Sequence, residues 1–150
     1  MKKKDYLFVA ALILLDQLTK FYISHNFELY RKHEIIHDFF YITYARNTGA
    51  AWSFGEGFGT VFVIVALLMC TAIIWYLHRN KDIRWHYRVI MLLILAGGIG
   101  NAIDRIAYGS VIDFLDFYIF GYDFPIFNIA DCCITIAMIG MIVTLFTDKE

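Results

Sequence analysis

Long apolar segments alternate with short charged segments along the 150 residues of this chain. Four apolar runs cover roughly residues 6–23, 58–77, 87–103 and 129–146. An α-helix needs about 17–25 such residues to cross the hydrocarbon core of a bilayer, and each run has that length. The pattern therefore predicts a membrane protein of the all-α class with four transmembrane helices.

A different pattern lies between the first two runs. Residues 39–44 read FFYITY, which is rich in aromatic and β-branched side chains and is typical of a strand. Gly49, Gly55, Gly57 and Gly59 punctuate the segment that follows. We expect a small β-sheet element here, lying on the outer surface of the membrane.

Basic residues predict the orientation in the membrane. Lys2, Lys3 and Lys4 precede the first run, and the connection between the second and third runs contains Arg79, Lys81, Arg84 and Arg88. Short loops rich in Lys and Arg stay in the cytoplasm. Both termini and this connection are therefore expected inside, and the connections over about residues 24–57 and 104–128 are expected outside.

Composition agrees with a membrane protein and excludes some other classes. Hydrophobic residues make up 60% of the chain, against about 45–50% in a soluble domain. The net charge is −1, and no basic patch indicates a nucleic-acid partner. We expect one domain over residues 1–150. The three cysteines are interpreted as small buried apolar residues rather than as a disulfide or a metal site.

Two aspartates are the first candidates for chemistry. Asp131 lies in the first turn of the expected fourth helix, which Asn128 is placed to cap, and the helix dipole there favours an ionised carboxylate. Asp113 lies among apolar residues at the outer membrane surface, where an ionisable group is costly and usually functional. Two neighbouring carboxyls can share one proton and supply a general acid and a general base. The alternative is that both are solvated loop acids or helix caps.

Other polar residues are placed near the same outer helix ends. Asp16 and Lys20 are one helical turn apart and can form a neutral pair on one face. Asn101, Asp104 and Arg105 lie at the outer end of the third expected helix. Arg105 is placed to pair with Asp104 or to hold a substrate carbonyl, and either a supporting or a structural role fits these positions.

The segment HEIIH, residues 33–37, matches the zinc-protease pattern H-E-x-x-H. That pattern requires a helix, on which both histidines face one ion. In a strand His33 and His37 would be about 13 Å apart, and the segment runs directly into the expected strand. We therefore expect no metal site. A serine nucleophile is not indicated, because the chain has no G-x-S-x-G motif.

Four motifs together resemble those of the lipoprotein signal peptidases, also called type II signal peptidases. They are DQLTK (16–20), RNTGAAW (46–52), GNAIDR (100–105) with VIDF (111–114), and FNIAD (127–131). Their order and spacing agree with that family across nearly the whole chain. One departure is Cys132, where the family often has a serine after the second catalytic aspartate.

This resemblance implies an aspartic endopeptidase with Asp113 and Asp131 as its catalytic dyad and with no cofactor. It also implies a group of supporting or substrate-binding positions: Asp16, Lys20, Asn47, Gly49, Asn101, Asp104, Arg105, Asn128 and Ala130. The implied substrate is a diacylglyceryl-modified prolipoprotein, cut just before the lipidated cysteine at the outer face of the bacterial cytoplasmic membrane. The implied inhibitor is the cyclic peptide globomycin, and membrane lipid is the other expected partner.

Three other functions remain open at this point. A small ion- or proton-coupled transporter would line a path through the bilayer with its charges, whereas here they gather toward the outer helix ends. A membrane zinc protease would depend on HEIIH. A non-catalytic assembly factor would keep its function without either aspartate.

Overall fold

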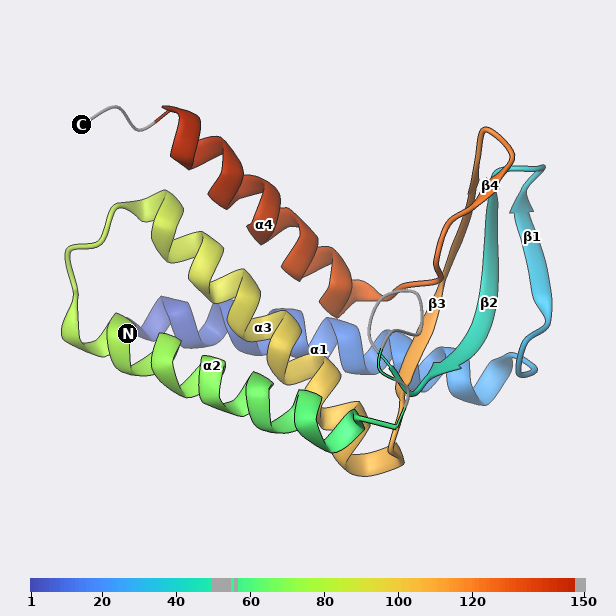
Figure 1. The fold of residues 1–150 in the computed structure, drawn as a ribbon, viewed down its shortest axis with the longest axis horizontal. Helices are drawn as coiled ribbons and strands as arrows, with labels where there is room; N and C mark the ends of the chain where they lie inside the picture. The colour runs from blue at the N-terminus through green and yellow to red at the C-terminus, as the bar shows by residue number, and fades with distance from the viewer. Residues whose placement is uncertain (50–54, 56, 148–150) are drawn as a thin grey trace.

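The structure, a computed structural model, describes residues 1–49, 55 and 57–147. Its helices are α1 (Lys3–Asn26), α2 (Gly59–Arg79), α3 (Trp85–Tyr108) and α4 (Ile129–Thr147) (Figure 1). All four are long and apolar enough to cross a membrane. The prediction of four transmembrane helices is therefore confirmed.

Helix α3 continues to Tyr108, five residues beyond the end of its apolar run at residue 103. The extension begins with Asp104 and Arg105, and Asp104 remains helical because it is buried and paired with Lys20. Gly109 ends α3 because it takes a left-handed conformation, with φ of 70°, which glycine adopts without steric cost.

Four antiparallel strands form one sheet in the order β1-β2-β3-β4. They are β1 (Lys32–Ile36), β2 (Phe40–Asn47), β3 (Val111–Ile119) and β4 (Tyr122–Asp123). The predicted strand over residues 39–44 corresponds to β2. Strand β3 was not predicted, and it pairs with β2 through partners such as Ala45 and Asp113, which are far apart in the sequence.

The sheet lies at one end of the helical bundle (Figure 1). The start of α1, the end of α4 and the connection between α2 and α3 lie at the opposite end. This arrangement agrees with the sequence-based prediction that the outer connections and the termini lie on different sides of a membrane.

Two apolar clusters hold these parts together. One joins α1, α2 and α3 through buried residues such as Val9, Leu77 and Leu95. The other packs Ile23 of α1 against Phe114 of β3 and thereby fixes the sheet on the end of α1. Helices α3 and α4 approach closely at Gly97, where a Cβ atom would collide with the carbonyl oxygen of Ala130. Small residues permit such close packing between membrane helices.

Candidate active site

A short backbone pairing joins β3 to the start of α4. The amide of Leu115 donates to the carbonyl of Phe127 at 2.8 Å, and the amide of Phe127 donates to the carbonyl of Leu115 at 3.1 Å. Asp113 lies two residues before Leu115, and Asp131 lies four residues after Phe127. The pairing therefore brings the two predicted aspartates, 18 residues apart in the sequence, into one site.

Asn128 caps α4 and contacts both aspartates. Its Oδ1 accepts a hydrogen bond from the amide of Asp131 at 2.9 Å, and Asp131 Oδ2 accepts one from the amide of Asn128 at 3.2 Å. This reciprocal arrangement is a capping box. The side-chain nitrogen of Asn128 donates to Asp113 Oδ1 at 2.6 Å. The predicted cap is confirmed, and it also orients both carboxyls.

Asp113 lies on β3 and is almost fully buried, with 2% of its surface exposed. Its Oδ2 accepts a hydrogen bond from Asn47 Nδ2 at 3.2 Å. Burial and the nearby Asp131 carboxylate raise the pKa of Asp113 to about 7, although hydrogen bonds from Asn128 and Asn47 oppose the shift. A buried carboxyl beside a second one resists losing its proton, so Asp113 can hold a proton near neutral pH.

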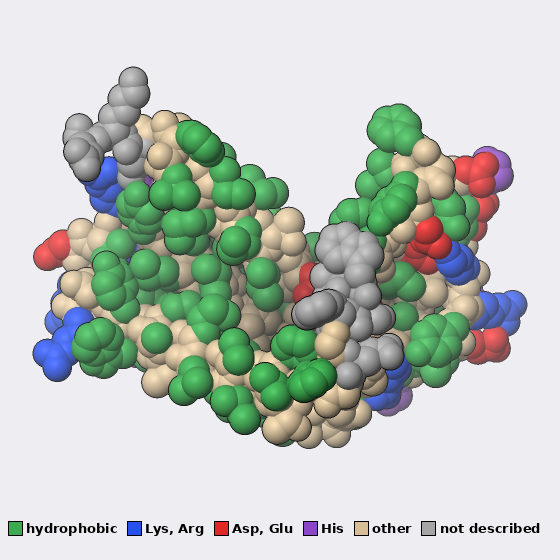
Figure 2. Space-filling view, viewed as in Figure 1, with side chains coloured by type: hydrophobic (Ala, Val, Ile, Leu, Met, Phe, Trp, Pro, Cys, Tyr) green, Lys and Arg blue, Asp and Glu red, His purple; other side chains and the backbone are tan. Residues whose placement is uncertain are grey.

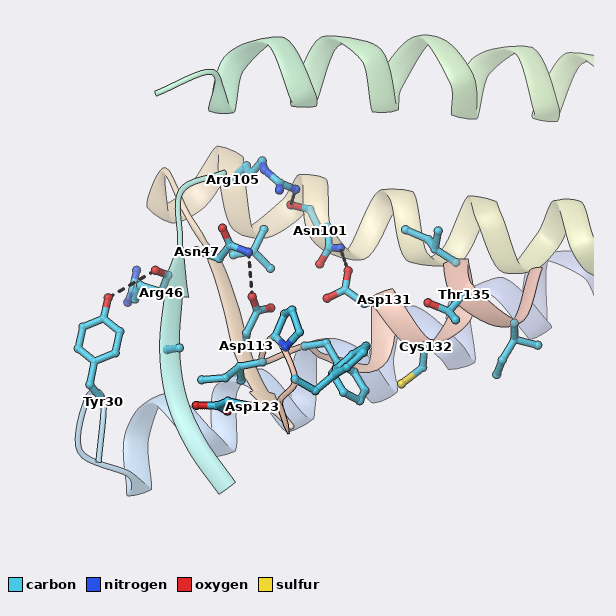
Figure 3. Close-up of a pocket in the computed structure, with 18 residues that line it drawn as sticks. Tyr30, Arg46, Asn47, Asn101, Arg105, Asp113, Asp123, Asp131, Cys132 and Thr135 are labelled. Carbon is cyan, nitrogen blue, oxygen red and sulfur yellow. Dashed lines mark hydrogen bonds between the residues drawn. The ribbon is translucent and has the colours of Figure 1, made fainter. Parts of the chain in front are cut away.

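Asp131 is partly buried and lies in the first turn of α4. Its Oδ1 accepts a hydrogen bond of 2.7 Å from Asn101 Nδ2 on α3. Figure 3 shows the Asp113 and Asp131 carboxyls pointing into the same space. Both carboxyls line a cleft of about 1030 Å³.

The cleft continues along α4 from the aspartates into the membrane-spanning part of the helix. Its lining there is mostly apolar and includes Cys132, Ile134, Thr135 and Ile136. Figure 2 shows a hollow between the helical bundle and the sheet, with hydrophobic side chains on both sides. The site is therefore open toward the region that lipid occupies.

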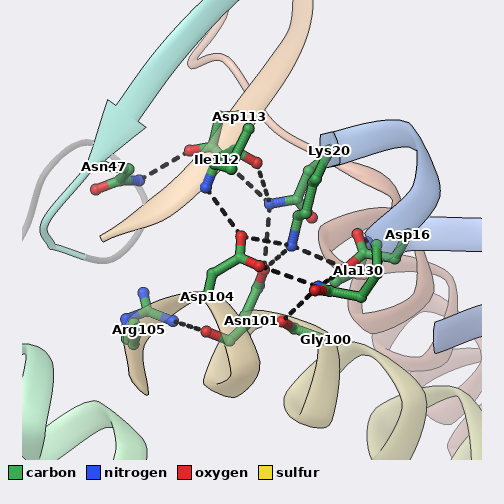
Figure 4. Close-up of polar contacts among 12 residues, drawn as sticks. Asp16, Lys20, Asn47, Gly100, Asn101, Asp104, Arg105, Ile112, Asp113 and Ala130 are labelled. Carbon is green, nitrogen blue, oxygen red and sulfur yellow. Dashed lines mark hydrogen bonds and ion pairs between the residues drawn. The ribbon is translucent and has the colours of Figure 1, made fainter. Parts of the chain in front are cut away.

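A buried ion cluster lies directly behind the two aspartates (Figure 4). Lys20 Nζ is 2.9 Å from Asp16 Oδ2 and 3.0 Å from Asp104 Oδ2, and all three side chains are at most 2% exposed. The predicted Asp16–Lys20 pair is confirmed. Asp104 pairs with Lys20, and no described contact pairs it with Arg105.

Each acid of this cluster holds one of the elements that carry Asp113 and Asp131. Asp16 Oδ1 accepts from the amide of Ala130, the residue before Asp131, at 2.9 Å. Asp104 Oδ2 accepts from the amide of Ile112, the residue before Asp113, at 3.0 Å. Lys20 contacts both acids and offsets one of their two negative charges, and hydrogen bonds from backbone amides and from Gln17 stabilise the carboxylates further. The cluster therefore sets the position of α4 relative to β3.

Gln17 belongs to this cluster, although the sequence analysis did not select it. Its Nε2 donates to Asp104 Oδ1 at 3.0 Å and to the carbonyl of Gly100 at 3.2 Å. Gln17 lies within the DQLTK motif, directly after Asp16, and this adjacency was the only signal for it in the sequence. The uncharged Gln17 amide therefore links the carboxylates of Asp16 and Asp104 without adding a charge.

Arg105 holds the segment that follows β2. Its Nη2 donates to the carbonyl of Gly49 at 2.7 Å, and the amide of Gly49 donates to Asn47 Oδ1 at 2.9 Å. Asn47 in turn contacts Asp113. Arg105 thus supports the Asp113 side of the site through Gly49. Residues 50–52 of the RNTGAAW motif lie outside the described residues.

HEIIH is mostly strand, as predicted, because β1 contains four of its five residues. His33 contacts the ring of Phe27, while His37 follows the strand and lies near Glu34 and Asp38. The ligand atoms of Glu34, His37 and Asp38 are within 4.8 Å of one another, and all three residues are exposed. The two histidines do not share a helical face, so the zinc-protease geometry is absent from these described residues.

All three cysteines are free. Cys70 and Cys133 are buried, in agreement with their interpretation as small apolar residues. Cys132 is only partly buried and lines the cleft beside Asp131. For this residue the expectation of a buried position was wrong, because its side of α4 faces the cleft.

Comparison with known proteins gives one consistent result. The family model described as "Signal peptidase (SPase) II" matches residues 8–147. Proteins named "Lipoprotein signal peptidase" from Staphylococcus aureus strains JH9 and Newman are each 39% identical over 144 residues, which is 96% of this chain and 88% of theirs.

Solved structures agree with the sequence matches. A "Bacterial membrane enzyme structure by the in meso method at 2.3 A resolution" matches with a TM-score of 0.88 and 37% identity, over 98% of this chain and 93% of that chain. A second, at 1.9 A resolution, has a TM-score of 0.86 and 38% identity, over 97% and 94%. The transporter alternative is not supported.

Proposed function

The chain belongs to the signal peptidase II family, whose members cleave signal peptides from prolipoproteins, and we propose that it does so as an aspartic endopeptidase with Asp113 and Asp131 as its catalytic dyad. One observation carries the assignment. The two carboxyls meet in one cleft, share Asn128 as a hydrogen-bonding partner, and lie where burial raises the pKa of Asp113 to about 7.

The chemistry follows from a dyad that holds one proton between two carboxyls. A water molecule lies between the dyad and the scissile carbonyl. The ionised carboxyl removes a proton from this water as its oxygen attacks the carbonyl carbon, and the protonated carboxyl donates its proton to the carbonyl oxygen. The resulting tetrahedral intermediate breaks its C–N bond when the nitrogen takes a proton from the dyad. The products are a signal-peptide carboxyl and a new amino terminus.

The remaining predicted residues have supporting roles in this proposal. Asn47, Asn101 and Asn128 donate amide hydrogen bonds to the dyad. Asp16, Asp104 and Lys20 hold α4 and β3 in place. Ala130 has a supporting role in packing, because it is only 1% exposed and its small side chain lies close to α3. Arg105 and Gly49 hold Asn47. Such fixed donors need no reorganisation during the reaction.

The lipid on the substrate fits the apolar part of the cleft. A diacylglyceryl cysteine would keep its chains in the membrane alongside Ile134 and Ile136 of α4, where burial stabilises by about 0.8 kcal/mol per methylene. The scissile bond would then lie at the level of Asp113 and Asp131. An inhibitor of the globomycin type would occupy the same cleft. In this arrangement the sheet lies outside the cytoplasmic membrane and both termini lie inside.

The dyad is tested with purified enzyme and a diacylated prolipoprotein. Asp113→Asn and Asp131→Asn each retain the side-chain volume but remove a carboxyl, so each should abolish turnover in a folded protein. Asp38→Asn is the matched control, because Asp38 is an exposed carboxylate on the β1–β2 turn. Near-normal activity in either dyad variant would contradict the aspartic mechanism, and loss of activity on chelation, restored by zinc, would favour a metalloprotease.

Lipid recognition is tested separately with two substrates that differ only at the cysteine. We expect the diacylated precursor to be cleaved about a hundredfold faster than the free-thiol precursor, because displacement by about an ångström costs that much. Initial rates are measured in the same bilayer. Equal rates would show that the acyl chains are not recognised, even if the dyad is correct.

A further inference from the structure

The tip of the β3–β4 hairpin, residues 119–122, is apolar and exposed. Phe120 is fully exposed, Ile119 is 40% exposed and Tyr122 is 56% exposed. No charged residue lies among the four. An exposed apolar patch of this kind usually marks a protein or membrane contact.

The face of β3 that carries the tip also carries the active site. Successive side chains of a strand point to opposite faces, so Asp113, Leu115, Phe117 and Ile119 share one face. Phe117 stacks on Phe127 with ring centroids 5.7 Å apart. Apart from Asp113, this face of β3 is apolar from the dyad to the tip.

The opposite face of β3 is apolar next to the bundle, where Phe114 packs on α1, and becomes polar toward the tip. Asp116 is 3.3 Å from Lys32 Nζ, and Lys32 also lies 3.4 Å from Asp123. The ammonium of Lys32 lies over the ring of Tyr118, 4.7 Å from its centroid. The half of the sheet nearest the tip therefore has one apolar face and one charged face, which is the distribution expected of a structure that rests at a bilayer interface.

The hollow between the helical bundle and the sheet (Figure 2) is lined by Phe124 and Phe127 on one side and by Ile134 and Ile136 of α4 on the other. Helix α4 exposes Ile136, Ile139 and Val143 along its length. The hairpin extends sideways from the outer end of the bundle, beyond the helices (Figure 1). A bilayer that contacts α4 is thus continuous with the space beneath the hairpin.

From these features we propose that the tip at residues 119–122 docks into the lipid interface of the outer leaflet, with Phe120 as its main anchor. Aromatic side chains are favoured at this depth. Asp113 lies six residues from Ile119 on the same strand, roughly 20 Å along it. Docking of the tip would therefore fix the height of β3, and with it the height of Asp113, relative to the membrane surface.

The docking is tested by tryptophan fluorescence, independently of catalysis. Phe120→Trp is placed in a background where Trp52, Trp75 and Trp85 are replaced by Phe, and the protein is reconstituted in phosphatidylcholine and phosphatidylglycerol vesicles. We expect quenching by brominated lipid and protection from aqueous iodide. His37→Trp is the control, because His37 is exposed among charged residues on the other hairpin and should be quenched by iodide. The same response at both positions would overturn the proposal.

The effect on Asp113 is tested by Phe120→Asp, and this second measurement alone rests on the proposed function. Phe120 has φ of 51°, a conformation that Asp tolerates better than most residues, so the variant should fold. We expect cleavage in vesicles to slow by about tenfold, with a much smaller change in detergent micelles. The control variant His37→Asp should leave the cleavage rate unchanged both in vesicles and in detergent micelles. An unchanged rate in vesicles would show that the tip does not set the position of Asp113.

Discussion

At the scale of single residues, Asn128 has the most connections to the proposed chemistry. Its Oδ1 caps α4, and its Nδ2 donates to Asp113 at 2.6 Å and to Asn101 Oδ1 at 3.1 Å. Asn128 is fully buried. A neutral amide serves here because it joins two carboxyls without adding a third negative charge.

Replacing this amide with a carboxylate tests that role. Asn128→Asp keeps the shape and the capping oxygen but removes the donor to Asp113, so we expect cleavage to fall by about a hundredfold or more. The control is Asn80→Asp at the end of α2, an exposed position at the opposite end of the bundle. Initial rates and thermal unfolding are measured for both. Retention of full activity by Asn128→Asp would show that the donor is dispensable.

The raised pKa of Asp113 predicts the pH dependence of the reaction. The dyad works with one proton, and a pKa of about 7 means that this proton is lost as the pH rises above that value. The value of kcat/KM should therefore decline about tenfold per pH unit in the alkaline range. The measurement uses a substrate without titratable groups near the scissile bond. A rate that stays constant from pH 7 to pH 9 would contradict the proton assignment.

At the scale of elements, α1 and α3 position the two elements that carry the dyad. Asp16 binds the start of α4, Asp104 binds the start of β3, and Lys20 lies between the two acids. Because all three charges are buried, removal of Lys20 leaves both acids without a counter-charge, which is more costly than loss of a surface pair.

Lys20→Met measures that cost. The variant would leave Asp16 and Asp104 buried without a counter-charge, so we expect the free energy of unfolding to fall by about 3–5 kcal/mol. Arg31→Met is the control, because it breaks only the exposed pair with Glu28 and should cost no more than about 1 kcal/mol. Both are compared by denaturation in the same mixed micelles. Equal effects would mean that Lys20 does not stabilise the cluster.

A glycine pair on α3 tests the packing around the same cluster. A Cβ at Gly100 would lie 2.7 Å from Asp16 Oδ2 and 3.2 Å from the Ala130 side chain, whereas a Cβ at Gly98 would meet only Cys70 Sγ at 3.3 Å. Gly100→Ala should therefore displace Asp16 and α4 and slow cleavage by about a hundredfold. Gly98→Ala should have a small effect. The rates of the two variants, measured side by side, decide whether the position of the methyl group matters.

At the scale of the whole molecule, charge and the hydrophobic spans predict the orientation. The end of the bundle predicted to be cytoplasmic is held by a buried pair in which Arg88 Nη1 is 2.8 Å from Asp5 Oδ2. The sheet and the cleft lie at the opposite end (Figure 1). A substrate emerging from the membrane would thus meet the dyad on the outer side.

Reporter fusions test this orientation. A fusion near Asp82, between α2 and α3, should report the cytoplasm, and a fusion near Asp123, on β4, should report the outside. Alkaline phosphatase and a cytoplasm-active fluorescent protein give opposite signals for each site. An outside signal near Asp82 would invert the topology and place the cleft on the cytoplasmic face.

Four features could be predicted from local sequence: the four transmembrane helices, the strand at β2, the cap at Asn128 and the Asp16–Lys20 pair. These features depend on neighbouring residues, because a bilayer selects long apolar helices and a capping residue acts within one turn. The dyad candidates also emerged from local context, since carboxyls at membrane depth are costly.

How these parts meet could be seen only in the folded chain. Strand β3, the extension of α3 to Tyr108, the link through Gln17 and the cleft position of Cys132 all depend on partners distant in the sequence. Strand pairing between Ala45 and Asp113 is not encoded in either segment alone. Polar residues that read locally as a helix end, such as Asp104, remain helical because a buried lysine on another helix compensates their charge.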